Sequence, residues 1–186
     1  LDEAYAAAAS AGSAMARLSV LRARGHTLVQ AGRHAQARLV FVDALELALT
    51  MRTSRVPVVL ANAVALDLRV GDPRAAIDRF TRHQFVLPAG SDGGEDLVPA
   101  HCAALAVAAL QQDWRRVTYH FERVQRHGSW PWAALWCNAQ LLASAAERAR
   151  KKGRTRVAAE IARAALQRCG ALGDRPVRAR LEALDA

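Results

Sequence analysis

The sequence predicts an all-α fold, a right-handed α-solenoid of stacked antiparallel helical hairpins. Composition is the first observation, because alanine and arginine, both strong helix formers, dominate a chain of 186 residues. A hydrophobic content of 52% with only 5% aromatic residues is typical of a folded domain. The second observation is a pattern that recurs about every forty residues, as in repeat proteins.

Each copy of this pattern has a turn residue, a small apolar residue five positions later and, in three copies, a phenylalanine four positions after that. Phe80 follows Phe41 by 39 positions, and Phe121 follows Phe80 by 41. The copies are Gly32, Ala37, Phe41, Ala44; Gly71, Ala76, Phe80, His83; Gln112, Val117, Phe121, Val124; and, more weakly, Gly153, Ala158, Ala162, Ala165.

Each copy describes a helical hairpin. Gly32 and Gly71 stand where a first helix ends, because glycine adopts the left-handed conformation that closes a helix. Asp72 and Pro73 then begin a second helix, since aspartate accepts from free amides and proline fits the first turn. A small residue such as Ala37 lets the two helices approach. One hairpin cannot bury its apolar stripe alone, so neighbours stack.

We expect a single helical-repeat domain at 14–186, preceded by a tail or frayed helix at 1–13. Residues 88–96, rich in turn formers and acids, are expected to be a loop between hairpins. Helices are expected at about 14–31, 35–50, 56–70, 74–86, 97–111, 114–127, 132–152, 155–169 and 176–184. The repeats are expected at about 18–51, 57–90, 98–131 and 132–170, with a cap at 176–186.

Residues 18–51 resemble the tetratricopeptide repeat. The matching residues are Gly25, Gly32, Ala37, Phe41 and Ala44. Residues 57–90 are similar, with Ala76, Phe80 and Pro88, although Val64 stands where that family often has glycine. The resemblance implies paired helices and a scaffold that binds protein segments.

Residues 98–132 resemble the pentatricopeptide repeat, which shares the paired-helix unit. The matching residues are Phe121, Val124, Gly128 and Pro131. Asp113 and Trp114, before the second helix, are similar to residues in organellar repeat proteins. The whole resemblance covers roughly 18–170, and this part of it implies binding of single-stranded RNA in mitochondria or plastids.

Pentatricopeptide proteins read one base per repeat with two side chains, one in the first helix and one at the end of the repeat. The matching pairs here are Arg22 with Arg52, Ala61 with Ser91, and Cys102 with Trp132. The family expects Asn, Ser or Thr paired with Asp or Asn, and no pair fits. We therefore expect RNA contact dominated by phosphates, with little base specificity.

The formal net charge of +9 predicts a negatively charged partner, the alternative being arginines on solvated helix faces. The main candidate contact is the stretch 148–156. Its basic residues are Arg148, Arg150, Lys151, Lys152, Arg154 and Arg156. A helix C-terminus favours cations and accounts for Lys151 and Lys152 without a ligand. Arg154 and Arg156 lie at the positive start of the next helix, where a phosphate would fit them together with the free amides.

A second group of candidates lies in 113–132. Arg116 and Arg123 are seven positions apart and share a helix face. Trp130 and Trp132 are candidates for stacking on bases. The alternatives are a solvated face for the arginines and packing for the tryptophans. Packing is the expectation for Trp114 and Trp136, which fall in helices.

The sequence contains no motif of a known catalytic class, so we expect no enzyme, cofactor, metal, small-molecule substrate or membrane segment. Cys102, Cys137 and Cys169 are odd in number and far apart, which favours free thiols and an intracellular, reducing compartment. His101 beside Cys102 is the nearest approach to a metal pair, but adjacent helical residues point in different directions.

We therefore expect a non-catalytic helical-repeat binding module in an organellar, specifically mitochondrial, RNA-associated assembly. The alternative is a tetratricopeptide-like protein-interaction scaffold, including an arm of a larger regulator. The partners are accordingly RNA, protein subunits of a larger complex, or both. The first hypothesis predicts RNA affinity that falls steeply with salt. The alternative predicts no such affinity at physiological salt and a groove lined by first-helix residues.

Overall fold

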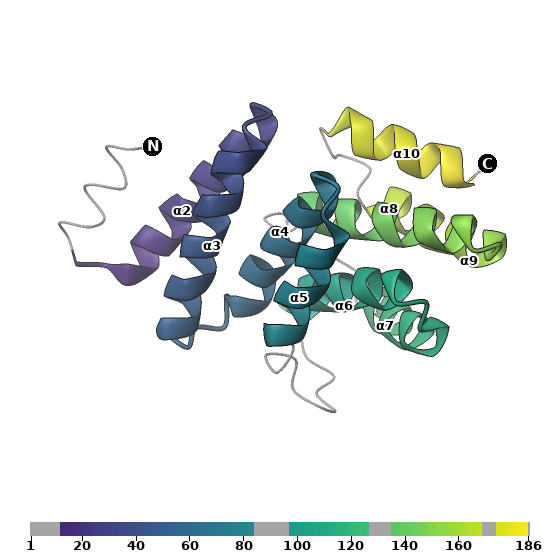
Figure 1. Ribbon diagram of the computed structural model, residues 1–186, viewed down its shortest axis with the longest axis horizontal. Helices are drawn as coiled ribbons and strands as arrows, with labels where there is room; N and C mark the ends of the chain where they lie inside the picture. The colour runs from purple at the N-terminus through teal and green to yellow at the C-terminus, as the bar shows by residue number, and fades with distance from the viewer. Residues whose placement is uncertain (1–11, 84–96, 127–134, 169–173, 186) are drawn as a thin grey trace.

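The structure is a computed structural model that describes residues 12–83, 97–126, 135–168 and 174–185. These residues form nine α-helices and no strand (Figure 1), so the all-α prediction is confirmed. Each expected helix is present within a few residues of its expected ends. The helices are α2 (Ala14–Gln30), α3 (His34–Thr50), α4 (Val56–Arg69), α5 (Pro73–His83), α6 (Val98–Leu110), α7 (Trp114–Arg126), α8 (Leu135–Lys151), α9 (Thr155–Arg168) and α10 (Arg175–Asp185). Residues 1–11 and the expected loop at 88–96 lie outside the described residues.

Five turns among the described residues close in the same way. Four of them lie within the helix pairs and join α2 to α3, α4 to α5, α6 to α7, and α8 to α9, with positive φ at Gly32, Gly71, Gln112 and Gly153 (72°, 80°, 61° and 72°). The fifth joins α3 to α4 and has positive φ at Arg52 (49°). Each turn has two backbone hydrogen bonds, such as Gly32 N–H to Val29 O at 3.0 Å and Arg33 N–H to Leu28 O at 2.8 Å. This is the Schellman motif, which satisfies the last carbonyls of a helix. The recurring sequence pattern therefore marks one recurring turn.

The two helices joined by each turn pack against each other, and the pattern residues lie between them. The residues five and nine positions after the turn residue are buried in all four pairs: Ala37 and Phe41, Ala76 and Phe80, Val117 and Phe121, Ala158 and Ala162. Gly25 of α2 faces Phe41, and a Cβ there would lie 2.5 Å from Cε1 of the ring. The α2–α3 approach therefore requires glycine at this position.

The pairs pack on one another along the molecule, α3 on α4, α4 on α6 and α6 on α8, while α10 packs on α8 and α9. Figure 1 shows the α2–α3 pair at one end of the long axis and the α8–α9 pair toward the other. The order departs from a simple stack because α8 also packs against α4. Trp136 of α8 extends this contact to the first pair. Its ring centroid lies 5.8 Å from that of His26 and 6.5 Å from that of Phe41.

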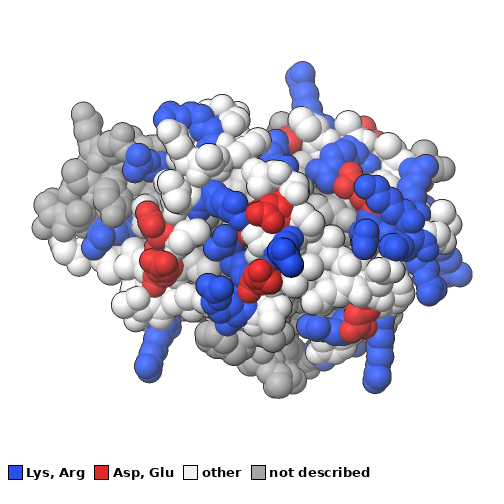
Figure 2. Space-filling view, in the orientation of Figure 1, with Lys and Arg blue, Asp and Glu red and all other residues white. Residues whose placement is uncertain are grey.

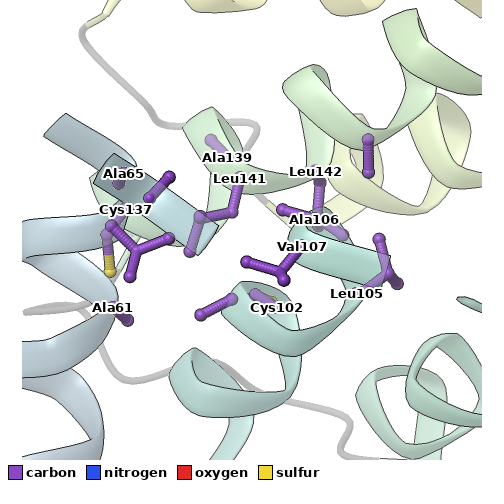
Figure 3. Close-up of a cluster of buried hydrophobic side chains, with 14 of the residues drawn as sticks. Ala61, Ala65, Cys102, Leu105, Ala106, Val107, Cys137, Ala139, Leu141 and Leu142 are labelled. Carbon is purple, nitrogen blue, oxygen red and sulfur yellow. The ribbon is translucent and has the colours of Figure 1, made fainter. Parts of the chain in front are cut away.

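The first helices of the second and third pairs are buried on all sides. Burial is unbroken from Val56 to Asp67 in α4 and from Val98 to Ala109 in α6. Small side chains allow the three helices α4, α6 and α8 to converge closely. Figure 3 shows part of this cluster, which includes Ala61 and Ala65 of α4, Cys102, Ala106 and Val107 of α6, and Cys137, Leu141 and Leu142 of α8. Over these stretches neither α4 nor α6 presents an exposed face.

Candidate nucleic-acid interface

The α6–α7 and α8–α9 turns lie side by side. The guanidinium of Arg154, at the start of α9, stands over the ring of Trp114, at the start of α7, with Cζ 5.7 Å from the ring centroid. Trp114 is partly buried and packs against the core, so its position is fixed. Two helix N-termini, both positive ends of helix dipoles, therefore open on one part of the surface.

Five cations from the two turns make up what we call the basic surface: Arg115, Arg116, Lys151, Lys152 and Arg154. All five are exposed, and within the described part of the chain no carboxylate pairs with them. Asp113 lies in the same turn, but its Oδ1 accepts the backbone N–H of Arg116 at 3.1 Å and caps α7. Figure 2 shows blue side chains gathered over the α8–α9 end of the molecule. The result is a concentration of uncompensated positive charge.

The remaining basic residues of 148–156 have protein partners. Arg150 donates from Nη1 to the carbonyl of Ala183 at 2.6 Å, near the end of α10. Arg148 donates from Nη2 to the carbonyl of Leu110 at 3.5 Å, at the end of α6. Arg156 pairs with Glu160 one turn further along α9, at 2.9 Å. Arg148 and Arg150 therefore have a structural role, since they satisfy carbonyls at helix ends.

The basic surface continues along one face of α7. Arg116, Tyr119, Arg123 and Arg126 are spaced by three, four and three positions, which places them on one helical stripe. Tyr119 is 45% exposed, and the guanidinium of Arg123 lies 5.3 Å from its ring centroid. Sequence reasoning identified Arg116 and Arg123 but missed Tyr119. Its position, three residues after Arg116 and four before Arg123, could have indicated that it shares their helix face.

The tryptophans divide as expected where the structure describes them. Trp114 and Trp136 are partly buried against the core, which confirms the packing prediction. Nε1 of Trp136 also donates to Oδ2 of Asp174 at 3.2 Å and so ties α8 to the start of α10. Trp130 and Trp132, the candidates for base stacking, lie outside the described residues.

The positions that would read bases in a pentatricopeptide repeat are largely inaccessible. Ala61 and Cys102 are fully buried, at 0% exposure, in the convergence of α4, α6 and α8. Their expected partners, Ser91 and Trp132, lie outside the described residues. A base cannot reach Ala61 or Cys102 without opening the core, so these two helices offer no base-reading face.

Two histidines form a buried pair between α6 and α7. Nδ1 of His101 lies 3.1 Å from Nδ1 of His120, and each residue is 7% exposed. Burial, reinforced by His101 and then by Arg116, lowers the pKa of His120 to about 4. At neutral pH the ring of His120 is therefore neutral, and one of the two Nδ1 atoms donates to the other.

Other potential chemistry is sparse in the described part of the chain. No group of three or more potential metal ligands occurs among the described residues. Cys102 and Cys137 are buried and form no disulfide, while Cys169 lies outside the described residues. The basic surface is therefore the strongest candidate site.

Within the described residues, no helix combines the length and apolar character needed to cross a bilayer. No family model matches the chain, and no curated protein or solved structure shows significant similarity to it. Function is therefore inferred from the fold and from the basic surface.

Proposed function

We propose that this protein is a non-catalytic helical-repeat module that binds single-stranded RNA through the basic surface, within a mitochondrial ribonucleoprotein assembly. In this proposal the four helix pairs are tetratricopeptide- or pentatricopeptide-like repeats that stack as a right-handed solenoid capped by α10. The observation that carries the proposal is the concentration of Arg115, Arg116, Lys151, Lys152 and Arg154 with no carboxylate partner in the described residues.

Phosphates suit this surface for two physical reasons. Five neighbouring cations repel one another, and a polyanion relieves that repulsion while it releases its own counterions. The N-termini of α7 and α9 add the positive ends of two helix dipoles. Because Ala61 and Cys102 are buried, recognition would depend on phosphates and show little sequence preference.

A tetratricopeptide-like groove is supported less well. Such a groove requires exposed residues on the first helices of successive pairs. In α4 the residues from Val56 to Asp67 are all buried, as are those from Val98 to Ala109 in α6. Protein contact through these two helices is therefore disfavoured, and a protein partner would have to use another face.

The test is a fluorescence-anisotropy titration of a labelled single-stranded RNA at about 50 and about 200 mM salt. If five phosphates are contacted, affinity should fall about a hundredfold between the two salt concentrations. Replacing Lys151, Lys152 and Arg154 with alanine should lower the logarithmic salt slope by about two. The same variant should weaken binding at least about tenfold at the lower salt concentration.

A matched control removes the same charge elsewhere. Arg74, Arg82 and Arg175 are exposed and have no carboxylate partner among the described residues. Their triple alanine variant should bind as the wild type does. Equal losses in both variants would assign the affinity to net charge and reject the site. No binding by the wild type at the lower salt concentration would reject RNA as the partner.

A further inference from the structure

Tyr119 is an exposed aromatic side chain on α7. Four large hydrophobic side chains are exposed among the described residues, and Tyr119, at 45%, is the aromatic one. Phe121 of the same helix is buried, and Trp114 packs against the core. Tyr119 therefore contributes little to the core, and its side chain reaches the surface.

Two contacts hold the ring of Tyr119 in place. The imidazole of His120 meets it in a T-shaped arrangement, with the ring centroids 5.0 Å apart and an angle of 75° between the planes. His120 is itself buried and lies 3.1 Å from Nδ1 of His101. The guanidinium of Arg123 lies 5.3 Å from the Tyr119 ring centroid. A ring that is ordered in advance loses little conformational freedom when a ligand stacks on it.

Tyr119 lies beside the basic surface. Arg116 stands three positions before Tyr119 and Arg123 four positions after it, which is one helical turn of about 5 Å in each direction. Helix α7 begins beside Arg154, whose guanidinium stands over Trp114. A strand whose phosphates contact the basic surface and follow α7 would therefore pass Tyr119.

The surface next to the ring suits an uncharged group better than a further phosphate. Glu122 is exposed and lies three positions after Tyr119, on the adjoining part of α7. Its carboxylate repels phosphates, whereas Arg116 on the other side of Tyr119 attracts them. A bound strand would thus keep its backbone toward Arg116 and turn a base toward the tyrosine ring.

We infer that Tyr119 stacks on an unpaired base of the RNA held by the basic surface, and that this contact favours single-stranded over double-stranded RNA. The inference rests on the proposed RNA binding. Bases in a duplex are stacked on one another, so they offer Tyr119 no free face, whereas those of a single strand do. Every base has such a face, so the contact adds affinity without sequence preference.

The test is an anisotropy titration, at about 50 mM salt, of a labelled single-stranded RNA and of the same RNA annealed to its complement. Tyr119→Ala should weaken binding of the single strand at least about fivefold. The same substitution should change binding of the duplex by less than about twofold, because the phosphate contacts remain. Circular dichroism verifies that each variant is folded.

Three further variants separate stacking from other effects of the substitution. Tyr119→Phe keeps the aromatic ring and should bind the single strand as the wild type does. Tyr119→Leu keeps an apolar side chain without an aromatic face and should bind it less tightly than Tyr119→Phe does. Leu39→Ala truncates another exposed hydrophobic side chain, on α3, and should have no effect.

Photochemical crosslinking locates the contact. 5-Iodouridine forms a covalent bond to an aromatic side chain that stacks on it when the complex is irradiated. In RNA that carries this base at successive positions, the crosslinked tryptic peptide should be 117–123, which contains Tyr119. Crosslinks found only in other peptides would overturn the inference.

Failure of the inference and failure of the proposed function give different results. No RNA binding by the wild type would reject both. If the variant lacking Lys151, Lys152 and Arg154 binds RNA weakly while Tyr119→Ala binds it as the wild type does, the basic surface stands and the stacking contact is rejected. Equal losses for single strand and duplex in Tyr119→Ala would also reject stacking.

Discussion

Gly25 shows how one residue can control the approach of two helices. The Phe41 ring that faces it is fully buried and is held by edge contacts with His26 at 5.4 Å and by the stacked ring of Trp136. A Cβ at Gly25 would lie within 2.9 Å of three atoms of that ring. Because the ring is enclosed, it cannot move aside without moving its neighbours.

We expect Gly25→Ala to destabilise the protein by about 1–3 kcal/mol. Alanine is more favourable than glycine in a helix by about 1 kcal/mol. A net loss of stability would therefore show that the clash with Phe41 outweighs this gain. The measurement is the urea midpoint of unfolding. In a Phe41→Leu background, Gly25→Ala should lower the free energy of unfolding less than it does beside Phe41. A raised midpoint for Gly25→Ala alone would show that α2 and α3 can separate freely.

Two histidines, the partly buried His26 and the buried His120, make stability depend on pH. Burial, and to a smaller extent Arg22, lowers the pKa of His26 to about 4, and His120 has a similar value. The unfolded value is about 6.5, so the unfolded chain binds more protons between these limits. Their contribution is complete above about pH 6.5 and is lost as the pH falls toward 4.

The expected loss between pH 7 and pH 5 is on the order of 1–2 kcal/mol for each histidine. Urea unfolding at a series of pH values measures it. His26→Phe retains an aromatic ring beside Phe41 and Trp136 and should flatten the pH dependence, whatever it does to stability at pH 7. An unchanged pH profile in this variant would show that His26 titrates normally.

At the scale of elements, Asp67 connects three helices. It lies on α4 and is fully buried, with Oδ1 2.9 Å from Arg38 of α3 and Oδ2 2.7 Å from Arg79 of α5. A single carboxylate thus fixes the α4–α5 pair to the helix before it. Removing the charge would leave two partly buried guanidinium groups without their shared partner.

Asp67→Asn should therefore cost about 3–5 kcal/mol. Thermal or urea unfolding measures the loss. Asp78→Asn is the matched control, because Asp78 is exposed on α5 and the change of charge is the same. We expect the control to stay within about 0.5 kcal/mol of wild type. Similar effects of both substitutions would rule out the bridging role of Asp67.

Local signals explain why the helices could be predicted and part of the packing could not. Gly32 and Gly71 mark turns whose hydrogen bonds join residues at most five positions apart, so they are visible in sequence. The contact of α8 with α4 joins residues far apart and has no such signal. The indirect sign is the apolar run of α6, since a helix that is apolar all round is buried.

The candidate site was predictable to a similar extent. Lys151, Lys152 and Arg154 form an obvious basic run in the sequence. Their juxtaposition with Arg115 and Arg116 depends on how two helix pairs pack, which no short motif encodes. The partners that engage Arg148 and Arg150 are carbonyls of α6 and α10, and backbone acceptors leave no trace in a sequence.

At the scale of the whole molecule, packing is less modular than in an open repeat array. In such an array each repeat contacts only its neighbours. Here α8 contacts α4, α6, α9 and α10, and Trp136 extends the contact to α2 and α3. The first and last pairs are thus fixed relative to each other through one helix.

This rigid link has a consequence for the basic surface. The α2–α3 pair lies at one end of the long axis and the α8–α9 pair toward the other (Figure 1). Because α8 packs against α4 and Trp136 reaches α2 and α3, the basic surface stands at a fixed distance from the first helix pair. In the proposed assembly, anything attached to the α2–α3 end would therefore meet the RNA at a set distance and in one orientation.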